Sequence, residues 1–336
     1  MSQHNQTNLS RRTFVCGSGI LAGGMMVAGR GSGAEPETAV APQAAKELPQ
    51  RVLGRTNVPV TTMTLGTAPC GLCPDIPQSD IVRIVNEALD LGITAVDTAP
   101  AYKKAEEPVG TALGKRRKEV FLSTKVLAET VAEAEKSLSS SLKLLKTDCV
   151  DLVYFHSVGD CDVEKSLADD GVFPWLLKQK QAGKFRFLGI SGHNRPAKFV
   201  PFLETDEVDV LLTLVNFVDR FTYAFEDKVL PVARKHNVGI VAMKVFGGAR
   251  KSAGSYENAQ APPELDVEHL QTAVRYALNT PGVATANLGA HNLAQVRQNV
   301  ELVRNFTPLT DDEMAQLTRL GQRLAGQWGP HFGSVT

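Results

Sequence analysis

The sequence predicts a single α/β domain folded as a (β/α)8 TIM barrel, and three observations lead to this prediction. Eight short apolar runs, typical of buried parallel strands, recur along the chain, and a segment with helical periodicity follows each run. Together these units occupy about 250 residues, which is the usual size of this barrel. No G-x-G-x-x-G motif follows the first run, so the rival doubly wound sheet lacks its dinucleotide-binding signature.

Composition narrows the class of protein before any motif is considered. The chain has 336 residues, with 36 Lys plus Arg against 36 Asp plus Glu, and 43% of its residues are apolar. Average glycine and proline contents exclude collagen-like and wholly disordered chains. Because the net charge is zero, no basic field is available for nucleic acid, and we expect no nucleic-acid partner. Composition therefore indicates a soluble, globular and enzymatic chain.

Residues 1–34 have the layout of an export signal. Arg11 and Arg12 precede an apolar, glycine-rich run over residues 14–29, and Ser32-Gly33-Ala34 offers a cleavage site. The arginine pair followed by Phe14 resembles a twin-arginine signal, which makes the twin-arginine export machinery an expected partner. The run is short and weakly hydrophobic for a spanning helix. We predict an exported, periplasmic bacterial protein with no membrane span in its mature form; anchoring by an uncleaved signal is the alternative.

The remaining chain divides into a linker, a barrel and a tail. Residues 35–50 are rich in Ala, Pro and Glu and predict a flexible linker. The barrel is expected over residues 51–326 and a C-terminal tail over residues 327–336. The first expected helix buries one face, after a cap at Ser79 or Asp80. That face is made of Ile81, Ile84, Val85, Ala88 and Leu89.

The other elements follow in alternation. The expected strands span residues 63–66, 93–97, 120–125, 149–156, 185–191, 208–216, 238–244 and 283–289. Helices are expected around residues 106–113 and 131–145, and between the later strands. The second, third and fourth strands end in Asp97, Lys125 and His156. Because active sites of this barrel lie at the carboxyl ends of its strands, these three side chains are candidate site residues.

The residue types at these strand ends indicate acid–base chemistry. An isolated buried charge is costly, so we expect Asp97 and Lys125 to pair. Tyr102 lies five residues beyond Asp97 and can fold back over the mouth. A phenol is a poor acid at pH 7, but its pKa should fall beside an ammonium group. We therefore expect Asp97 to hold Lys125 charged and aimed at the Tyr102 oxygen, with His156 bonding the substrate oxygen. Each residue alone is compatible with a structural role; the four together predict catalysis.

The same residues carry a family resemblance. Asp97-Thr98-Ala99-Pro100-Ala101-Tyr102, followed by Glu106 and Gly110, resembles the D-T-A-x-x-Y…E…G segment of aldo-keto reductases. Further segments match that family in the same order: Ser123-Thr124-Lys125, Val150-Asp151-Leu152…His156, Gly183-Lys184…Leu188-Gly189-Ile190-Ser191 and Pro308-Leu309-Thr310…Glu313. The likeness runs from about Arg51 to Ala325 and includes residues 51–56, which resemble the family's opening hairpin.

The resemblance implies both a reaction and a cofactor. A nicotinamide dinucleotide would lie across the strand ends, and a carbonyl would be reduced by hydride transfer, or an alcohol oxidised. Tyr102 would be the acid/base, Lys125 and Asp97 would tune it, and His156 would orient the substrate. Ser191 fits the residue that bonds the nicotinamide carboxamide, although Gly192 replaces the asparagine usual after it.

Other cofactor positions match the family less closely. Met243, before Lys244, stands where an aromatic ring commonly stacks on the nicotinamide, and a thioether can make that contact. The segment from Gly289 to Asn299 resembles the part of the family that binds the adenosine phosphate. Its candidate contacts are Gly289, His291, Gln295 and Asn299.

The donors expected for a 2′-phosphate are mostly missing from that segment. Many members carry Lys-Ser and Arg where this chain has Gly289, Ala290 and Gln295, which leaves only His291 and Arg297 as nearby charged donors. The resemblance therefore implies NADP(H) as the cofactor, with NAD(H) as the competitor.

Two functional classes remain open from sequence. The first is a nicotinamide-dependent oxidoreductase acting on a small carbonyl or a sugar-like alcohol. The second is an exported barrel that binds a cofactor or small ligand as a sensor, without turnover. Cys70, Cys73 and Cys161 lie in loops expected at the same mouth. A disulfide between these loops is the alternative, and unpaired cysteines are the favoured interpretation. We expect no metal site, because C-x-x-C alone offers too few ligands.

Overall fold

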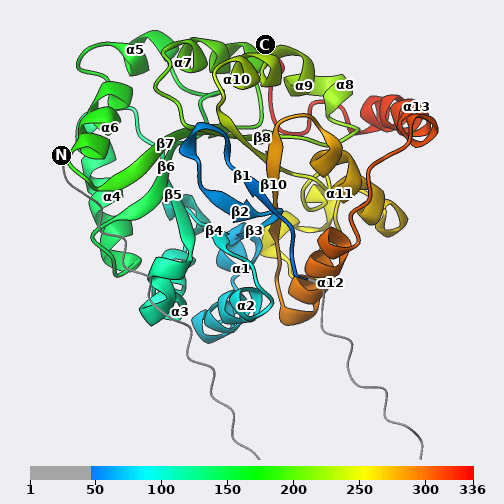
Figure 1. Ribbon diagram of the computed structural model, residues 1–336, viewed down its shortest axis with the longest axis horizontal. Coiled ribbons are helices and arrows are strands. Elements are labelled where there is room, and N and C mark those ends of the chain that lie inside the picture. The colour runs from blue at the N-terminus through cyan, green and yellow to red at the C-terminus, as the bar shows by residue number, and fades with distance from the viewer. Residues whose placement is uncertain (1–46) are drawn as a thin grey trace, which may run out of the picture. The chain divides into compact units, whose positions relative to one another are not determined.

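Eight parallel strands close into a barrel in the order in which they follow one another along the chain (Figure 1). The computed structural model describes residues 47–336, so the predicted signal at residues 1–34 lies outside the described part. The barrel strands are β3 (Met63–Gly66), β4 (Ala95–Asp97), β5 (Phe121–Val126), β6 (Val150–Phe155), β7 (Phe185–Gly192), β8 (Val210–Leu214), β9 (Gly239–Met243) and β10 (Val283–Gly289). The barrel closes where β10 pairs with β3, Ala286 opposite Met63. The predicted (β/α)8 fold is confirmed.

Helices surround the strands and cover their outer faces (Figure 1). They are α1 (Ala68–Leu72), α2 (Gln78–Asp90), α3 (Glu106–Leu113), α4 (Val131–Leu144), α5 (Val163–Leu167), α6 (Val172–Gln181), α7 (Val200–Glu204), α8 (Arg220–Tyr223), α9 (Phe225–Lys228), α10 (Leu230–Lys235), α11 (Leu270–Asn279), α12 (Leu293–Arg304) and α13 (Asp311–Trp328). The short elements between α7 and α10 show that one predicted unit contains several helical pieces. All eight strand–helix units are nevertheless present.

Helix α2 illustrates what periodicity predicted and what it missed. The five apolar residues of its predicted face, from Ile81 to Leu89, are all buried. The predicted cap was wrong: Pro77, in an extended conformation, is the N-cap, and no side chain caps the helix. Ser79 and Asp80 lie inside the first turn instead. The carboxylate of Asp80 still stabilises this end, because it lies at the positive end of the helix dipole.

A β-hairpin closes the amino end of the barrel. Strands β1 (Gln50–Val52) and β2 (Pro59–Thr61) pair antiparallel, as the opening segment predicted. Leu53 and Val60 are buried among apolar side chains of the barrel interior. Gly54 has a positive φ, and a Cβ there would overlap the backbone at Gly239, so glycine is required at this contact.

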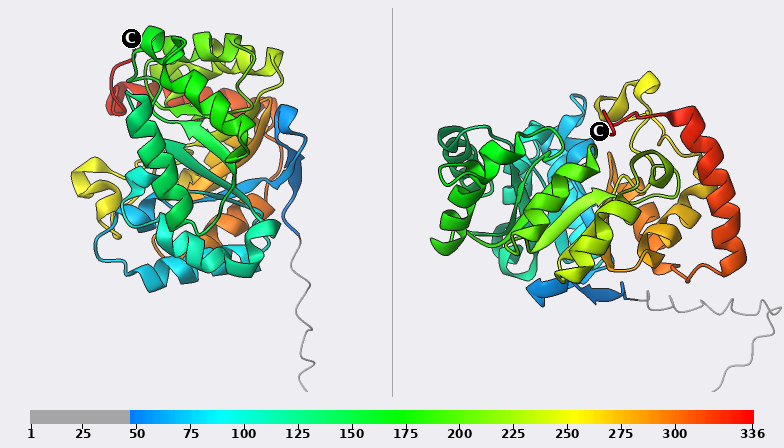
Figure 2. Two further views of the ribbon diagram at one scale, coloured as in Figure 1. Left: turned by 90° about the vertical axis from the view of Figure 1, so that its left-hand side faces the viewer. Right: turned by 90° about the horizontal axis from the view of Figure 1, so that it is seen from above.

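The chain's last residues cross the opposite end of the barrel. Figure 2 shows the hairpin at one end and the C-terminus, with the segment around residues 250–260, at the other. The Tyr223 hydroxyl accepts a hydrogen bond from Phe332 N (2.7 Å) and donates one to Gly333 O (3.1 Å). His331 Nε2 lies 2.9 Å from the buried Asp219 carboxylate. The tail thus forms part of the mouth at the carboxyl ends of the strands. Within residues 47–336 no helix has the length and hydropathy of a membrane span.

Candidate active site

A buried ion pair lies at the carboxyl ends of β4 and β5. Lys125 Nζ donates to both oxygens of Asp97, at 2.7 and 2.6 Å, and to the carbonyl of Thr98 at 2.8 Å. Lys125 is 1% exposed and Asp97 is 2% exposed. Burial lowers the pKa of Lys125, and the charge of Asp97 opposes that change. The predicted pair is therefore present, and each charge is the main compensation for burying the other.

Two neutral side chains complete the surroundings of Asp97. Ser123 Oγ donates to Asp97 Oδ1 at 2.7 Å, and Asn287 Nδ2 donates to Asp97 Oδ2 at 2.9 Å. With Lys125, each carboxylate oxygen receives two hydrogen bonds. The sequence analysis did not identify Asn287, because it lies within an apolar strand and no motif marks it.

Tyr102 lies beside this ion pair, but not as predicted. It ends a 3₁₀ helix (Pro100–Tyr102) that follows β4, and its ring centroid lies 4.9 Å from Lys125 Nζ. The ammonium group lies near this ring, and its hydrogen bonds go to Asp97 and Thr98. The expected fall in pKa was wrong: burial, together with the charge of Asp97, raises the pKa of Tyr102 well above its usual value. In this structure burial and the carboxylate therefore outweigh the effect of the neighbouring ammonium group on the phenol.

Two histidines follow the next strands. His156 comes directly after β6, and burial, with the charge of Lys125, lowers its pKa well below the usual value. His193 follows β7, and burial, with the nearby Lys244, lowers its pKa to about 3. The His193 ring stacks on Phe332 of the tail, with centroids 5.6 Å apart. Both imidazoles are neutral at pH 7, so each can donate one N–H bond. The sequence analysis did not identify His193 or Phe332.

Five of the seven predicted cofactor residues line one pocket next to this cluster. They are Lys244, Gly289, His291, Gln295 and Asn299. Asn287 and Tyr256 line the same pocket. Ser191 and Met243 are not among its lining residues; they lie near the ends of β7 and β9, and the Ser191 hydroxyl is buried without a hydrogen-bond partner.

Contacts around this pocket hold its polar groups in place. Gln295 Oε1 accepts a bond from His291 N at 2.7 Å, and Asn299 Nδ2 donates to Gly289 O at 3.0 Å. Lys244 Nζ lies 3.2 Å from the Tyr256 hydroxyl. Tyr256 belongs to a 3₁₀ helix (Ser255–Glu257) in a loop without a recognisable motif, which is why sequence analysis missed it.

Neither Arg297 nor His291, the two charged donors expected for a 2′-phosphate, offers a free positive charge. Arg297 Nε pairs with Glu87 of α2 at 2.6 Å. Burial lowers the pKa of His291, so that imidazole is neutral at pH 7. Lys244 is therefore the cation among the described residues that line this pocket.

The cysteines in the described part of the chain are unpaired. Cys70, Cys73, Cys149 and Cys161 are free thiols, so the favoured interpretation of unpaired cysteines is confirmed, and no disulfide joins the described cysteines. Burial raises the pKa of Cys70 to about 12, which makes its thiol unreactive at neutral pH. Within residues 47–336 no group of three or more His, Cys, Asp or Glu side chains is arranged to hold a metal ion.

The chain is similar to known proteins in sequence and in fold. Residues 62–271 match the Aldo/keto reductase family. An L-galactose dehydrogenase from Arabidopsis thaliana is 26% identical over 294 residues, which cover 78% of this chain and 90% of that protein. A methylglyoxal reductase from Salmonella typhi is 32% identical over 209 residues, covering 59% of this chain and 72% of its own. The holo form of an aldo-keto reductase from Bacillus halodurans superposes with a TM-score of 0.65 at 25% identity, covering 82% of this chain and 96% of that structure.

Proposed function

The chain belongs to the aldo/keto reductase family and is an oxidoreductase of that type, and from this premise we propose that it reduces a small aldehyde or ketone, or oxidises a sugar-like alcohol, with a nicotinamide dinucleotide. One observation carries the proposal. The Asp97–Lys125 pair lies against the Tyr102 ring, next to the pocket that gathers five predicted cofactor residues. Relatives named for L-galactose and for methylglyoxal represent both substrate classes.

In this proposal the chain's own residues move and hold the proton. Tyr102 is protonated at neutral pH and donates its proton to the substrate oxygen during reduction. Lys125, kept charged by Asp97, favours the phenolate that this transfer produces. Neutral His156 donates an N–H bond to the substrate oxygen and orients it. When bound, the nicotinamide supplies the hydride for reduction and accepts it for oxidation.

We propose NADP(H) as the cofactor, as the family relationship favours. Lys244, His291, Gln295 and Asn299 would hold its phosphates and adenosine, because they line one pocket. The buried, unpartnered hydroxyl of Ser191 suits the nicotinamide carboxamide, which offers the missing partner.

NAD(H) is the second candidate for a specific reason. Arg297 is paired with Glu87 and His291 is neutral, so neither offers a free charge to a 2′-phosphate in this structure. Titrating the protein with NADPH and with NADH, followed by nicotinamide fluorescence, decides between them. Tighter binding of NADPH supports the proposal, and equal or tighter binding of NADH selects the second candidate.

The reaction is tested by Tyr102→Phe. We expect kcat to fall at least about a hundredfold, because the variant lacks the proton donor. Binding of the cofactor should stay within about twofold, because only the hydroxyl is removed. Phe221→Tyr changes an exposed ring by the same atom, outside the four proposed catalytic residues, and serves as the matched control. Unchanged turnover in Tyr102→Phe would reject the catalytic assignment and would support the sensor alternative instead.

We also propose that the protein is exported through the twin-arginine machinery and works in the periplasm. The support is the sequence of residues 1–34, with Arg11 and Arg12 before an apolar run. Replacing both arginines by lysine keeps the charge and should leave the protein in the cytoplasmic fraction. Export that persists in this variant would contradict the proposal, and recovery in the membrane fraction would indicate an uncleaved anchor.

A further inference from the structure

Asn287 lies at the closure of the barrel, between two cavities. Its strand β10 pairs with β3, where Asn287 is opposite Thr64. Its side chain lines the small cavity inside the barrel that also contains Asp97 and Ser123. It also lines the pocket proposed for the cofactor, next to Lys244. Asn287 therefore lines both the cavity beside Asp97 and the pocket proposed for the cofactor.

The two ends of the Asn287 amide have different surroundings. Its Nδ2 donates to Asp97 Oδ2 at 2.9 Å. Its Oδ1 is buried and has no hydrogen-bond partner. Turning the amide over would place an oxygen against the carboxylate, so the charge of Asp97 selects the observed orientation. A buried acceptor without a partner destabilises a fold, and such an exception is expected where function requires it.

The neighbouring strand leaves room for this amide. A Cβ on Gly66 would overlap Asn287 Oδ1, so a side chain at this position of β3 would displace the amide. Gly66 of β3 and Asn287 of β10 thus fit against each other where these two strands close the barrel.

We propose that Asn287 is a positioning residue for the reaction, which holds the Asp97 carboxylate in the orientation that pairs it with Lys125 beside Tyr102. A hydrogen bond to a carboxylate favours its charged form, and Asn287 and Ser123 are the neutral side chains that supply one to Asp97. This inference rests on the proposed function.

Other titratable groups also face the pair and define its electrostatic surroundings. Asp97 meets Lys125 of β5, Tyr102 and Tyr154 of β6. Glu106 of α3 and His156 interact with Lys125. Lys125 is the cation among these groups, and both tyrosines and His156 are neutral at pH 7. Losing one donor at Asp97 is therefore not compensated by another positive charge.

Asn287→Leu tests the proposal, because leucine has a similar volume and no donor. We expect kcat for carbonyl reduction to fall about tenfold, while the Kd of the cofactor stays within about twofold. The KM of the carbonyl substrate should also stay within about twofold, because no group that binds the substrate is changed. Gly66→Ala should produce the same fall in kcat with Asn287 intact, since the added methyl displaces the amide.

Thr285→Val is the matched control within the same cavity. Thr285 lies two positions before Asn287 on β10, and its hydroxyl bonds the Thr64 hydroxyl at 3.0 Å rather than the Asp97 carboxylate. This variant should lower stability and leave kcat within about twofold. Equal effects of Asn287→Leu and Thr285→Val on kcat, or a kcat that does not fall in Asn287→Leu, would overturn the proposal. Full activity in Tyr102→Phe would instead reject the proposed function itself, so the two failures are distinguishable.

Discussion

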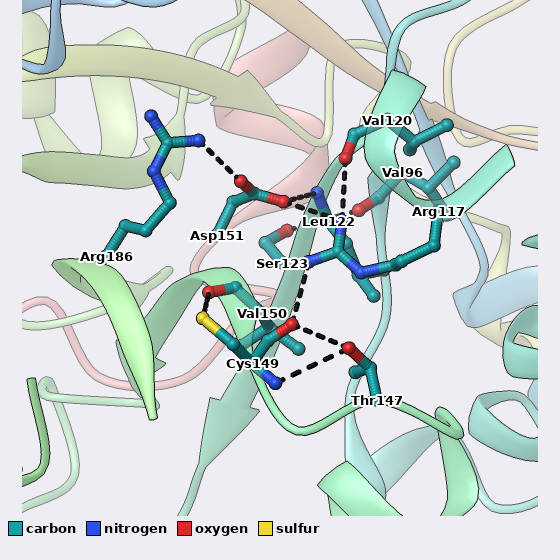
Figure 3. Close-up of polar contacts among 10 residues, drawn as sticks. All are labelled: Val96, Arg117, Val120, Leu122, Ser123, Thr147, Cys149, Val150, Asp151 and Arg186. Carbon is teal, nitrogen blue, oxygen red and sulfur yellow. Dashed lines mark hydrogen bonds and ion pairs between the residues drawn. The ribbon is translucent and has the colours of Figure 1, made fainter. Parts of the chain in front are cut away.

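Two of the buried aspartates, Asp97 and Asp151, form charged centres at opposite ends of the barrel, and their differences separate function from stability. Asp97 lies at the carboxyl end of β4 and is paired with Lys125. Asp151 lies near the amino end of β6 and is paired with Arg117 at 2.9 Å and Arg186 at 2.7 Å (Figure 3). The backbone amide of Leu122 also donates to Asp151, at 2.9 Å. Both carboxylates are therefore well supplied with donors.

The cations distinguish the two centres. Arg117 also donates to the carbonyls of Val120 and Cys149, both at 2.9 Å, so its guanidinium joins the amino ends of β5 and β6 (Figure 3). Arginine keeps its charge under all ordinary conditions and suits such a structural link. Lysine changes its pKa readily when buried, and Lys125 lies against a tyrosine ring. A buried carboxylate paired with a cation is thus not in itself evidence of catalysis. The end of the barrel at which the pair lies, and whether its cation is lysine or arginine, distinguish a catalytic pair from a structural one.

The largest expected effect comes from breaking the centre at the carboxyl end. Lys125→Met should lower kcat at least about a hundredfold, because Tyr102 loses its neighbouring charge. The same change leaves Asp97 buried without its counter-ion, so the free energy of unfolding should fall by about 3 kcal/mol. Steady-state kinetics and urea denaturation measure the two effects. Retained turnover in the folded variant would remove the distinction between the two centres.

Breaking the centre at the amino end should affect stability alone. Asp151→Asn removes the counter-ion of two arginines, and we expect the free energy of unfolding to fall by about 2 kcal/mol. The kcat of the folded fraction should stay within about twofold, because no group of the proposed site changes. Arg186→Ala is a milder control: its side chain is 53% exposed, so the loss should stay below about 1 kcal/mol. A tenfold fall in kcat for Asp151→Asn would contradict this assignment.

The pH dependence of stability should report on the carboxyl end of the barrel, where His193 is buried. His193 has a pKa of about 3 in the folded protein, below its unfolded value, so the unfolded chain binds more protons between these values. Stability contributed by the neutral imidazole is therefore lost as pH falls below about 6.5, by about 1.4 kcal/mol per pH unit. His193→Gln should reduce this acid sensitivity between pH 6 and pH 4.5, as measured by urea midpoints. An unchanged slope would show that His193 does not govern it.

Most of the site was predictable because its residues lie within local patterns. Asp97, Lys125 and His156 end or follow apolar strands, and parallel strands place their carboxyl ends together. The predicted ion pair followed from that arrangement, and the five pocket residues followed from the family resemblance. Asn287 could not be predicted, because it lies 190 residues from Asp97 and only the closure of β10 on β3 brings the two together.

The alternation of strands and helices can be predicted from the sequence alone, because apolar periodicity is a property of neighbouring residues. The charges that end the strands can be predicted in the same way. What those charges do depends on the folded structure. The Tyr102 ring lies near Lys125, and burial, together with the charge of Asp97, raises the pKa of its phenol. The tail places Phe332 against His193. Burial and electrostatic balance depend on every group that surrounds an atom, and those groups come from distant parts of the chain.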